Sequence, residues 1–338
     1  MSRTTPPRPE QVERLFPELA GFRGTATRLH PRPGTPSVRD GSVGGPLLWP
    51  ADEPWPMCTE RHRRRYGDRV ADVRLRRRIL AEAWSRAPEP GRQPGPTEEE
   101  GDVLRSLKRG RHAPWLQDTD PIPMLAVAQL FREDVPDLAG PADHDVLQVL
   151  WCPFDSHAGR HEPKVELRWR RSAEVGAVLE EQPEPEVVGA EGYVPERCVL
   201  HPEQVVEYQD LGLLPEDLRE RIHSWEGDED DIDESSVLYE TDLSIAPGWK
   251  AGGFASWHAT DPAPVVCDCG QAMDLLLTVA SSEWNNGCRS WIPLEDRPIA
   301  DTMDANIPTQ VTVGRWGDMN VFICRTDPAH SHRLVFQG

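Results

Sequence analysis

Two cysteines separated by one residue, Cys267 and Cys269, have a spacing that suits metal binding. Side chains alternate along an extended strand, so residues i and i+2 lie on the same face. His330 and His332 have the same spacing, and Cys324 precedes them. Zinc in structural sites prefers thiolate and imidazole donors, four of which form a tetrahedron. The sequence therefore predicts a zinc site built from the three cysteines and one or both histidines.

We interpret this zinc as structural, because a catalytic ion needs a vacant position and a nearby acid–base group. Gly270 lets the chain turn sharply after Cys269. Two alternatives stay open. In one, the cysteines are small buried residues and the histidines are surface polar groups. In the other, the protein supplies an incomplete metal shell, and Asp318 or Glu283 acts as the acid–base group of a zinc-dependent hydrolase.

Cys152 could be drawn as a nucleophile, with Asp155, His157 or His161, which follow it closely in sequence, as its base. Cysteine nucleophiles usually meet their histidine through the fold, so we interpret Cys152 as a strand-end cysteine followed by a polar loop. The motifs G-x-S-x-G, G-x-x-x-x-G-K-[ST], G-x-G-x-x-G and H-E-x-x-H do not occur. The common hydrolase, P-loop, Rossmann and metalloprotease classes therefore lose their usual support.

The composition favours a cytoplasmic protein with reduced cysteines. The chain has 338 residues and seven cysteines, and no segment approaches the roughly 20 apolar residues that span a bilayer. A chain of this length can bury a core without disulfides. The net charge of −20 makes nucleic acid an unlikely partner, since an acidic surface repels phosphate. We expect an unidentified protein or small molecule as the partner, and no membrane association.

Apolar periodicity predicts a mixture of helices and strands. A stripe of Val70, Val73, Leu80 and Trp84 predicts a helix over residues 69–84. The same reasoning predicts helices over residues 10–19, 103–108 and 215–225, and strands over residues 124–131, 146–152 and 165–170.

Two parts of the sequence resemble each other, which indicates an internal duplication. GGPLLWP (44–50) resembles GGFASWH (252–258), PMLAVAQL (123–130) resembles AMDLLLTV (272–279), and VLQVLWCP (146–153) resembles NVFICRTD (320–327). The first half is longer by a segment that we predict to be a helical insertion into a β-rich frame. Within a single domain of 1–338 we expect five parts: an N-terminal segment (1–18), a first half (19–58 and 113–224), the insertion (59–112), an acidic loop (225–242) and a second half (243–338).

Loop tryptophans and insertion arginines are the remaining candidates for binding. The tryptophans either line a ligand cleft or cap the core of a loop-rich β protein. If they line a cleft, the ligand-binding residues are Trp49, Trp55, Trp257, Trp284 and Trp316. The insertion carries a basic face, which either pairs with the protein's own acidic loop, faces solvent, or binds an acidic partner. Its arginines are Arg63, Arg64, Arg65, Arg76, Arg77 and Arg78.

Three further runs complete the set of motifs between residues 44 and 335: HPEQVVEY, APGWKAGGFASWHATDP and GRWGDMNVFICRTDPAHSHRL. Together these motifs resemble the YwqG-like family, a domain of unknown function. The resemblance implies an α+β fold of mostly antiparallel sheets in a cytosolic bacterial protein. The last third also resembles the zinc-containing C-terminal region of the programmed cell death 2 family, which implies a zinc-ribbon-like part. Cys-x-Cys and histidines stand here where that family has only cysteines, which leaves the ligand set open. The YwqG-like family brings no established reaction; some members sit beside toxin genes, which suggests an immunity or partner-binding role.

Overall fold

The computed structural model describes residues 2–64, 67–86, 95–107, 115–155, 157, 162–228, 232–233 and 236–338. Arg65, His161 and residues 229–231 and 234–235 of the predicted acidic loop lie outside the described residues. No helix in the described part of the chain has the length and apolar character needed to cross a membrane. Helices and antiparallel sheets both occur, so the predicted α+β class is confirmed.

The first of two large sheets has the strand order β12-β1-β13-β14-β15-β16, and its neighbours are all antiparallel. Most of its strands come from the second half of the chain. They are β1 (Arg23–Arg28), β12 (Glu203–Tyr208), β13 (Lys250–Gly252), β14 (Met273–Ala280), β15 (Asp318–Cys324) and β16 (Arg333–Gln337).

The second large sheet has the order β2-β11-β3-β7-β8-β9 and is also antiparallel. Its strands are β2 (Arg32–Pro33), β3 (Ser42–Val43), β7 (Leu125–Phe131), β8 (Val146–Trp151), β9 (Val165–Arg170) and β11 (Cys198–Val199). The strands predicted over 124–131, 146–152 and 165–170 are therefore confirmed. Two short ladders pair β4 (Met57–Cys58) with β6 (Ile122–Pro123) and β5 (Asp68–Arg69) with β10 (Val187–Val188).

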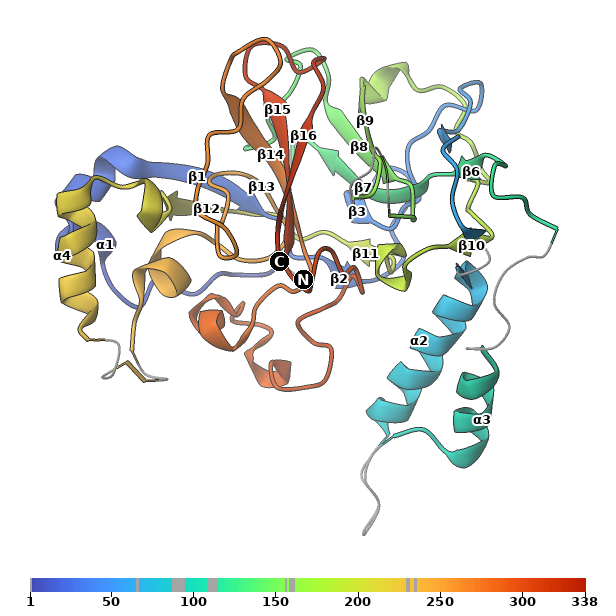
Figure 1. Ribbon diagram of the computed structural model, residues 1–338, viewed down its shortest axis with the longest axis horizontal. Helices are drawn as coiled ribbons and strands as arrows, with labels where there is room; N and C mark the ends of the chain where they lie inside the picture. The colour runs from blue at the N-terminus through green and yellow to red at the C-terminus, as the bar shows by residue number, and fades with distance from the viewer. Residues whose placement is uncertain are drawn as a thin grey trace.

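The main core lies between the two sheets. It combines Val127 and Val149 of the second sheet with Leu277 and Val321 of the first. Figure 1 shows the β14–β15 and β7–β8 hairpins in the middle of the molecule. Every residue of β8 is buried, which explains why its sequence reads as an apolar run and not as a strict alternation.

The strand pairing fits the duplication, because β3-β7-β8-β9 corresponds to β13-β14-β15-β16. The β7–β8 register shifts between Ala126 and Ala128, and the β14–β15 register shifts between Leu275 and Leu277. The same hairpin thus carries a bulge at the same place in both halves. Bulges are built-in features of a fold, so their coincidence supports a common origin.

Other details repeat at corresponding positions. Inside β7–β8 the Gln148 side chain donates a 2.9 Å hydrogen bond to Gln129, and inside β14–β15 Thr278 donates a 2.8 Å bond to Asn320. Both halves also carry two glycines at positive φ where β3 and β13 end: +76° and +71° at 44–45, and +67° and +71° at 252–253. The sequence pairing of 146–153 with 320–327 is wrong by two residues, because the registers match Val146 with Asp318.

The insertion contains two helices, α2 (Val70–Ser85) and α3 (Glu98–Leu107), which project from the body in Figure 1. The predicted apolar stripe of α2 is buried only near the body: Val70 and Val73 are buried, whereas Trp84 is 41% exposed. The predicted apolar stripe is therefore wrong at the far end of α2, where the helix extends beyond the sheets. Within the basic face, Arg76 pairs with the protein's own Glu191. That acid lies outside the predicted acidic loop.

The opposite end of the molecule carries α4 (Glu216–Glu226), as predicted over 215–225, and the short α1 (Val12–Leu15). Both pack in a separate apolar cluster around Leu19, Ile222 and Tyr239. The helix predicted over 10–19 is split into α1 and a 3-10 turn. In the described part of the chain the 3-10 helices are η1 (Pro17–Phe22), η3 (Ser172–Glu174), η4 (Glu191–Tyr193), η5 (Leu211–Leu213), η8 (Asn286–Trp291) and η9 (Arg297–Ile299). A π-helical turn, η7 (Tyr239–Ser244), also occurs.

Candidate metal centres

The structure brings together four of the five predicted zinc ligands: Cys267, Cys269, Cys324 and His330, here called the second-half cluster. Their donor atoms all lie within 4.8 Å of one another. The Cys267 sulfur lies 3.5 Å from Nδ1 of His330, and the sulfurs of Cys269 and Cys324 are 3.6 Å apart. All seven cysteines are free thiols. This group could hold a metal ion.

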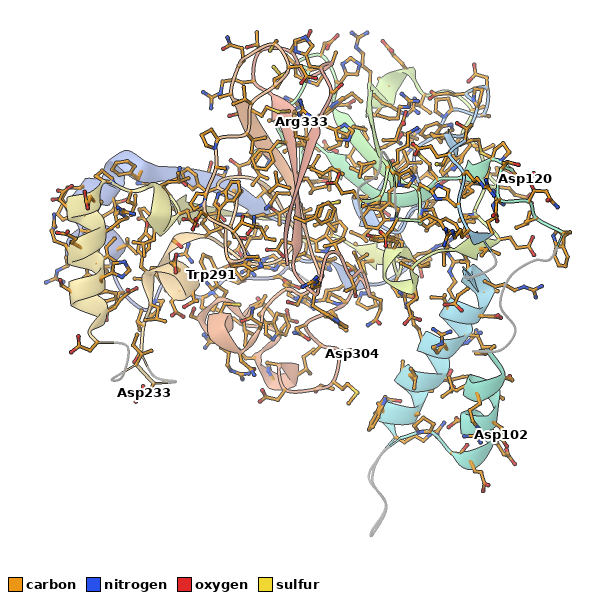
Figure 2. The ribbon with its side chains drawn as sticks, in the orientation of Figure 1. Asp102, Asp120, Asp233, Trp291, Asp304 and Arg333 are labelled. Carbon is orange, nitrogen blue, oxygen red and sulfur yellow. The ribbon has the colours of Figure 1, made fainter. Side chains whose placement is uncertain are left out.

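Local structure explains how these four residues meet. Cys324 is the last residue of β15, and His330 follows in the loop to β16. Cys267 and Cys269 occupy a tight turn in which Cys267 N–H donates to Gln271 and Gly270 N–H donates back to Cys267. Gly270 has φ +83°, a conformation that glycine adopts without strain. Arg333, which begins β16 and pairs with Asp268 of this turn, marks this end of the molecule in Figure 2.

His332 is not part of the cluster among the described residues. It lies one residue before β16, and burial lowers its pKa. The sequence left His330 and His332 as alternatives, since both share the i, i+2 spacing. Both histidines lie in the β15–β16 loop, but of the two only His330 joins the thiols, with its Nδ1 3.5 Å from the Cys267 sulfur.

A second group, missed by the sequence prediction, consists of Cys58, His62, Cys152 and His157, here called the first-half cluster. All four residues are buried, and their donor atoms also lie within 4.8 Å of one another. The Cys58 sulfur lies 3.4 Å from Nε2 of His62 and 3.5 Å from Nε2 of His157, and the Cys152 sulfur lies 3.6 Å from Nε2 of His62. Cys152 was interpreted as a strand-end cysteine. It does follow β8 directly, but it faces this cluster.

The two clusters occupy equivalent positions in the two halves. Leu150 pairs with Ala126 and Phe322 pairs with Leu275, each next to the bulge, so Leu150 corresponds to Phe322. Two residues further along each strand, Cys152 therefore corresponds to Cys324. Met57 pairs with Pro123, as Val266 pairs with Ala272. The next residues, Cys58 and Cys267, therefore correspond. His62 and Cys269 follow them, and His157 and His330 follow the strand-end cysteines. The duplicated frame thus carries one cluster per half.

Donor spacing in both clusters suits a tetrahedral ion. Bonds of about 2.3 Å to sulfur and about 2.0–2.1 Å to nitrogen place neighbouring donors of a tetrahedral zinc roughly 3.5–3.8 Å apart. Five of the donor separations run from 3.4 to 3.6 Å, and all lie within 4.8 Å. A disulfide would need about 2.05 Å between two sulfurs. The geometry therefore favours an ion over a disulfide.

Residues next to the first-half cluster orient its two histidines. Nδ1 of His157 lies 2.9 Å from the carbonyl oxygen of Glu162, so it is placed to donate its proton there and leave Nε2 free toward the thiols. His62 stacks on Phe154 with ring centroids 4.8 Å apart. Histidine ligands of metals are commonly held by such contacts.

Electrostatics within the first-half cluster favour one thiolate and one thiol. A hydrogen bond from Cys152 is the main reason that the pKa of Cys58 falls, and His157 and His62 add to the effect. The same contact with Cys58, together with burial, raises the pKa of Cys152. A bound divalent cation would let both thiols ionise, because coordinated thiols are deprotonated.

The second-half cluster shows the same division. A backbone hydrogen bond at Asp327 is the largest cause that lowers the pKa of Cys324 to about 6, and His330 contributes. The pKa of His330 rises, chiefly through its hydrogen bond with Cys324. At Cys267 the backbone bond with Cys269 lowers the pKa, but burial and the neighbouring thiols outweigh it and raise the pKa. An ionised Cys324 and a protonated Cys267 thus lie in one cluster, and a bound divalent cation would let both thiols ionise.

Neither acid–base candidate of the hydrolase alternative belongs to a cluster. Asp318 begins β15 and Cys324 ends it, a separation of about 20 Å at roughly 3.3 Å per residue. Glu283 is buried and contacts Nδ1 of His30 at 2.5 Å and the guanidinium of Arg32. Its carboxylate is fully engaged in this ion-pair network.

The five candidate tryptophans do not meet in one cleft. Trp49 and Trp55 pack against each other with centroids 5.0 Å apart, in the small core beside the first-half cluster. Trp257 packs against the equivalent core of the second half, whereas Trp284 belongs to a separate buried group. Trp316 is 67% exposed on a turn. Four of the five thus contribute to packing.

Comparisons with known proteins leave the family open. A scan against protein-family models and a search of curated proteins found no match to this chain. The resemblance to the YwqG-like and programmed cell death 2 families therefore stays a prediction.

Proposed function

We propose that this chain is a non-catalytic binding protein that holds two structural zinc ions, one in each half. The observation that carries the proposal is the number and spacing of donors: each cluster offers four protein donor atoms within 4.8 Å of one another. A structural zinc site has four protein ligands, whereas a catalytic site keeps one position for water. Zinc suits these sites better than harder cations, because every donor is a thiolate or an imidazole.

Each ion would join two segments that lie far apart along the chain. In the first half, Cys58 and His62 lie where the chain leaves the frame for the insertion, and Cys152 and His157 lie in the β8–β9 connection. Zinc would fasten the root of the insertion to the sheet. In the second half it would fasten the 267–271 turn to the β15–β16 loop. Binding energy of this kind is folding energy.

Partner binding is the role we propose for the frame that these ions stabilise. The insertion supports it, because it projects from the body and exposes Trp84 of α2 and Val103 of α3. Exposed apolar side chains that form a contiguous patch are typical of protein interaction surfaces. The hydrolase alternative has less support, since Asp318 and Glu283 lie outside both clusters.

Metal content of purified variants tests the proposal. We expect two zinc ions per wild-type chain by elemental mass spectrometry. The Cys58→Ser/Cys152→Ser and Cys267→Ser/Cys324→Ser double variants should each retain one. Cys198→Ser is the matched control: Cys198 is also buried, its sulfur donates to the Pro308 carbonyl, and it belongs to neither cluster. It should retain two.

Two results would contradict the proposal. A wild-type protein without zinc after purification and reconstitution would remove the metal from the account. Zinc-dependent hydrolysis of ester or peptide substrates, lost in either double variant, would favour the enzyme over the binding protein.

A further inference from the structure

The two clusters differ in how far solvent reaches their donors. All four residues of the first-half cluster are buried, whereas Cys269 and His330 of the second-half cluster are exposed. Cys267 and Cys324 are 5% and 0% exposed. An approaching molecule therefore meets only two of the second-half donors, and none of the first-half donors.

Of the two exposed donors, Cys269 is the less restrained. Its sulfur contacts Cys324, and the residues on either side, from Asp268 to Ala272, are exposed. A Cβ added at Gly270 would meet nothing within 4 Å, so the turn has open space around it. His330 is held more firmly, because its backbone N–H donates to the carbonyl oxygen of Asp327 and its Nε2 lies 3.6 Å from the Asp327 carboxylate.

The donor sets differ in charge as well. Zinc with two thiolates and two neutral imidazoles is formally neutral, whereas zinc with three thiolates and one imidazole carries a formal charge of −1. An excess of thiolate charge makes protonation and departure of one thiolate easier. Thiolate character and exposure together determine how readily a cysteine reacts.

We propose that the second-half cluster is an exchangeable zinc site that passes its ion to a thiol-bearing acceptor through replacement of Cys269, while the first-half cluster retains its ion. This inference rests on the proposed zinc binding. In the exchange step the acceptor's sulfur forms a bond to zinc as the bond from Cys269 breaks. The acceptor's S–H proton moves to the Cys269 sulfur, and no electrons are transferred. Cys267, Cys324 and His330 hold the ion during this step, and further acceptor thiols then replace them in the same way, each S–H proton passing to the sulfur or imidazole nitrogen that leaves zinc.

Zinc release from the wild-type protein tests the inference. The protein loaded with two ions is mixed with glutathione, and 4-(2-pyridylazo)resorcinol reports the zinc that leaves. We expect one equivalent to leave in a phase whose rate rises with glutathione concentration. The second should leave at least about tenfold more slowly, which corresponds to protection by about 1.4 kcal/mol. Equal rates for the two ions would overturn the inference and leave the two-zinc proposal standing. Absence of bound zinc would overturn both.

The variants assign each phase to a cluster. Cys58→Ser/Cys152→Ser should keep the fast equivalent, and Cys267→Ser/Cys324→Ser should keep the slow one; the reverse result would overturn the assignment. Because either variant could fail to fold, peptide mapping of the loaded wild-type protein after brief N-ethylmaleimide treatment provides a second measurement. Cys269 should be modified first, as one zinc leaves. Modification of Cys58 or Cys152 at the same rate would contradict the inference.

Discussion

Glu283 allows a test of whether this carboxylate is structural or catalytic. It is 3% exposed and lies between His30 and Arg32, and Arg32 also pairs with the buried Asp296. Burial alone would raise the pKa of Glu283. The hydrogen bond and charge of His30, with the charges of Arg32 and Arg28, outweigh burial and lower the pKa from 4.5 to about 2.

The size of this shift gives the expected effect on stability. One pKa unit corresponds to about 1.4 kcal/mol, so the ionised carboxylate contributes about 3 kcal/mol to the free energy of unfolding at pH 7. Because the pKa is lower in the folded state, this contribution is complete above about pH 4.5 and is lost as the pH falls from 4.5 toward 2.

The Glu283→Gln variant measures the contribution directly. Urea denaturation at pH 7 should show a free energy of unfolding lower than wild type by about 3 kcal/mol, and the difference should shrink below pH 4.5. Acid also releases zinc, but it does so in both proteins, so the difference reports on Glu283. Glu220→Gln, at an exposed position of α4, is the control and should change little. A difference that stays constant from pH 7 to pH 3 would refute the reasoning.

Three further predictions concern the second half of the chain. Lys250→Met leaves the buried Glu207 carboxylate without its 2.5 Å ion pair, and should cost about 3–5 kcal/mol in urea denaturation; an unchanged midpoint would contradict this. Gly253→Ala would place a methyl group against the Glu207 carboxylate at φ +71°, and should lower the melting temperature measured by circular dichroism. His332→Ala should keep both zinc ions in native mass spectrometry, whereas His330→Ala should weaken the second-half site; equal losses would show that His332 also binds zinc.

The second-half cluster could be predicted because its donors form two local pairs, Cys267 with Cys269 and Cys324 with His330. The turn at Cys267 is short, and Cys324 and His330 lie within one strand end and its loop. Cys58 and Cys152, by contrast, are separated by the whole insertion. Only the fold brings them together, and the spacing of Cys58 and His62 alone is common in sequences without metal.

The duplication could have shown the first-half cluster, but the pairing of β8 with β15 was displaced by two residues. Strand side chains repeat every two residues, so a shift of two keeps the same faces buried and leaves the apolar pattern unchanged. The displaced pairing put Cys152 opposite Thr326 and hid its match with Cys324. Bulge positions and strand register, which the sequence does not show, determine the correct pairing.

The tryptophans show a different limit of sequence reasoning. Gly and Pro near Trp49 and Trp55 correctly indicate irregular backbone, but not the direction of the side chains. In the fold the indole N–H groups donate to the carbonyls of Glu53 and Met124, so both rings can be buried without losing a hydrogen bond. Loops that satisfy indoles in this way form core, and a cleft cannot be inferred from their composition.

X-ray absorption at the zinc edge of the purified wild-type protein tests the central claim most directly. Five cysteines and three histidines serving two ions predict an average of 2.5 sulfur and 1.5 nitrogen donors per zinc, at about 2.3 Å and about 2.0–2.1 Å. This shell, with two zinc ions per chain, would support two closed structural sites. A single ion per chain, or a shell that includes water oxygen in place of a protein donor, would contradict the account.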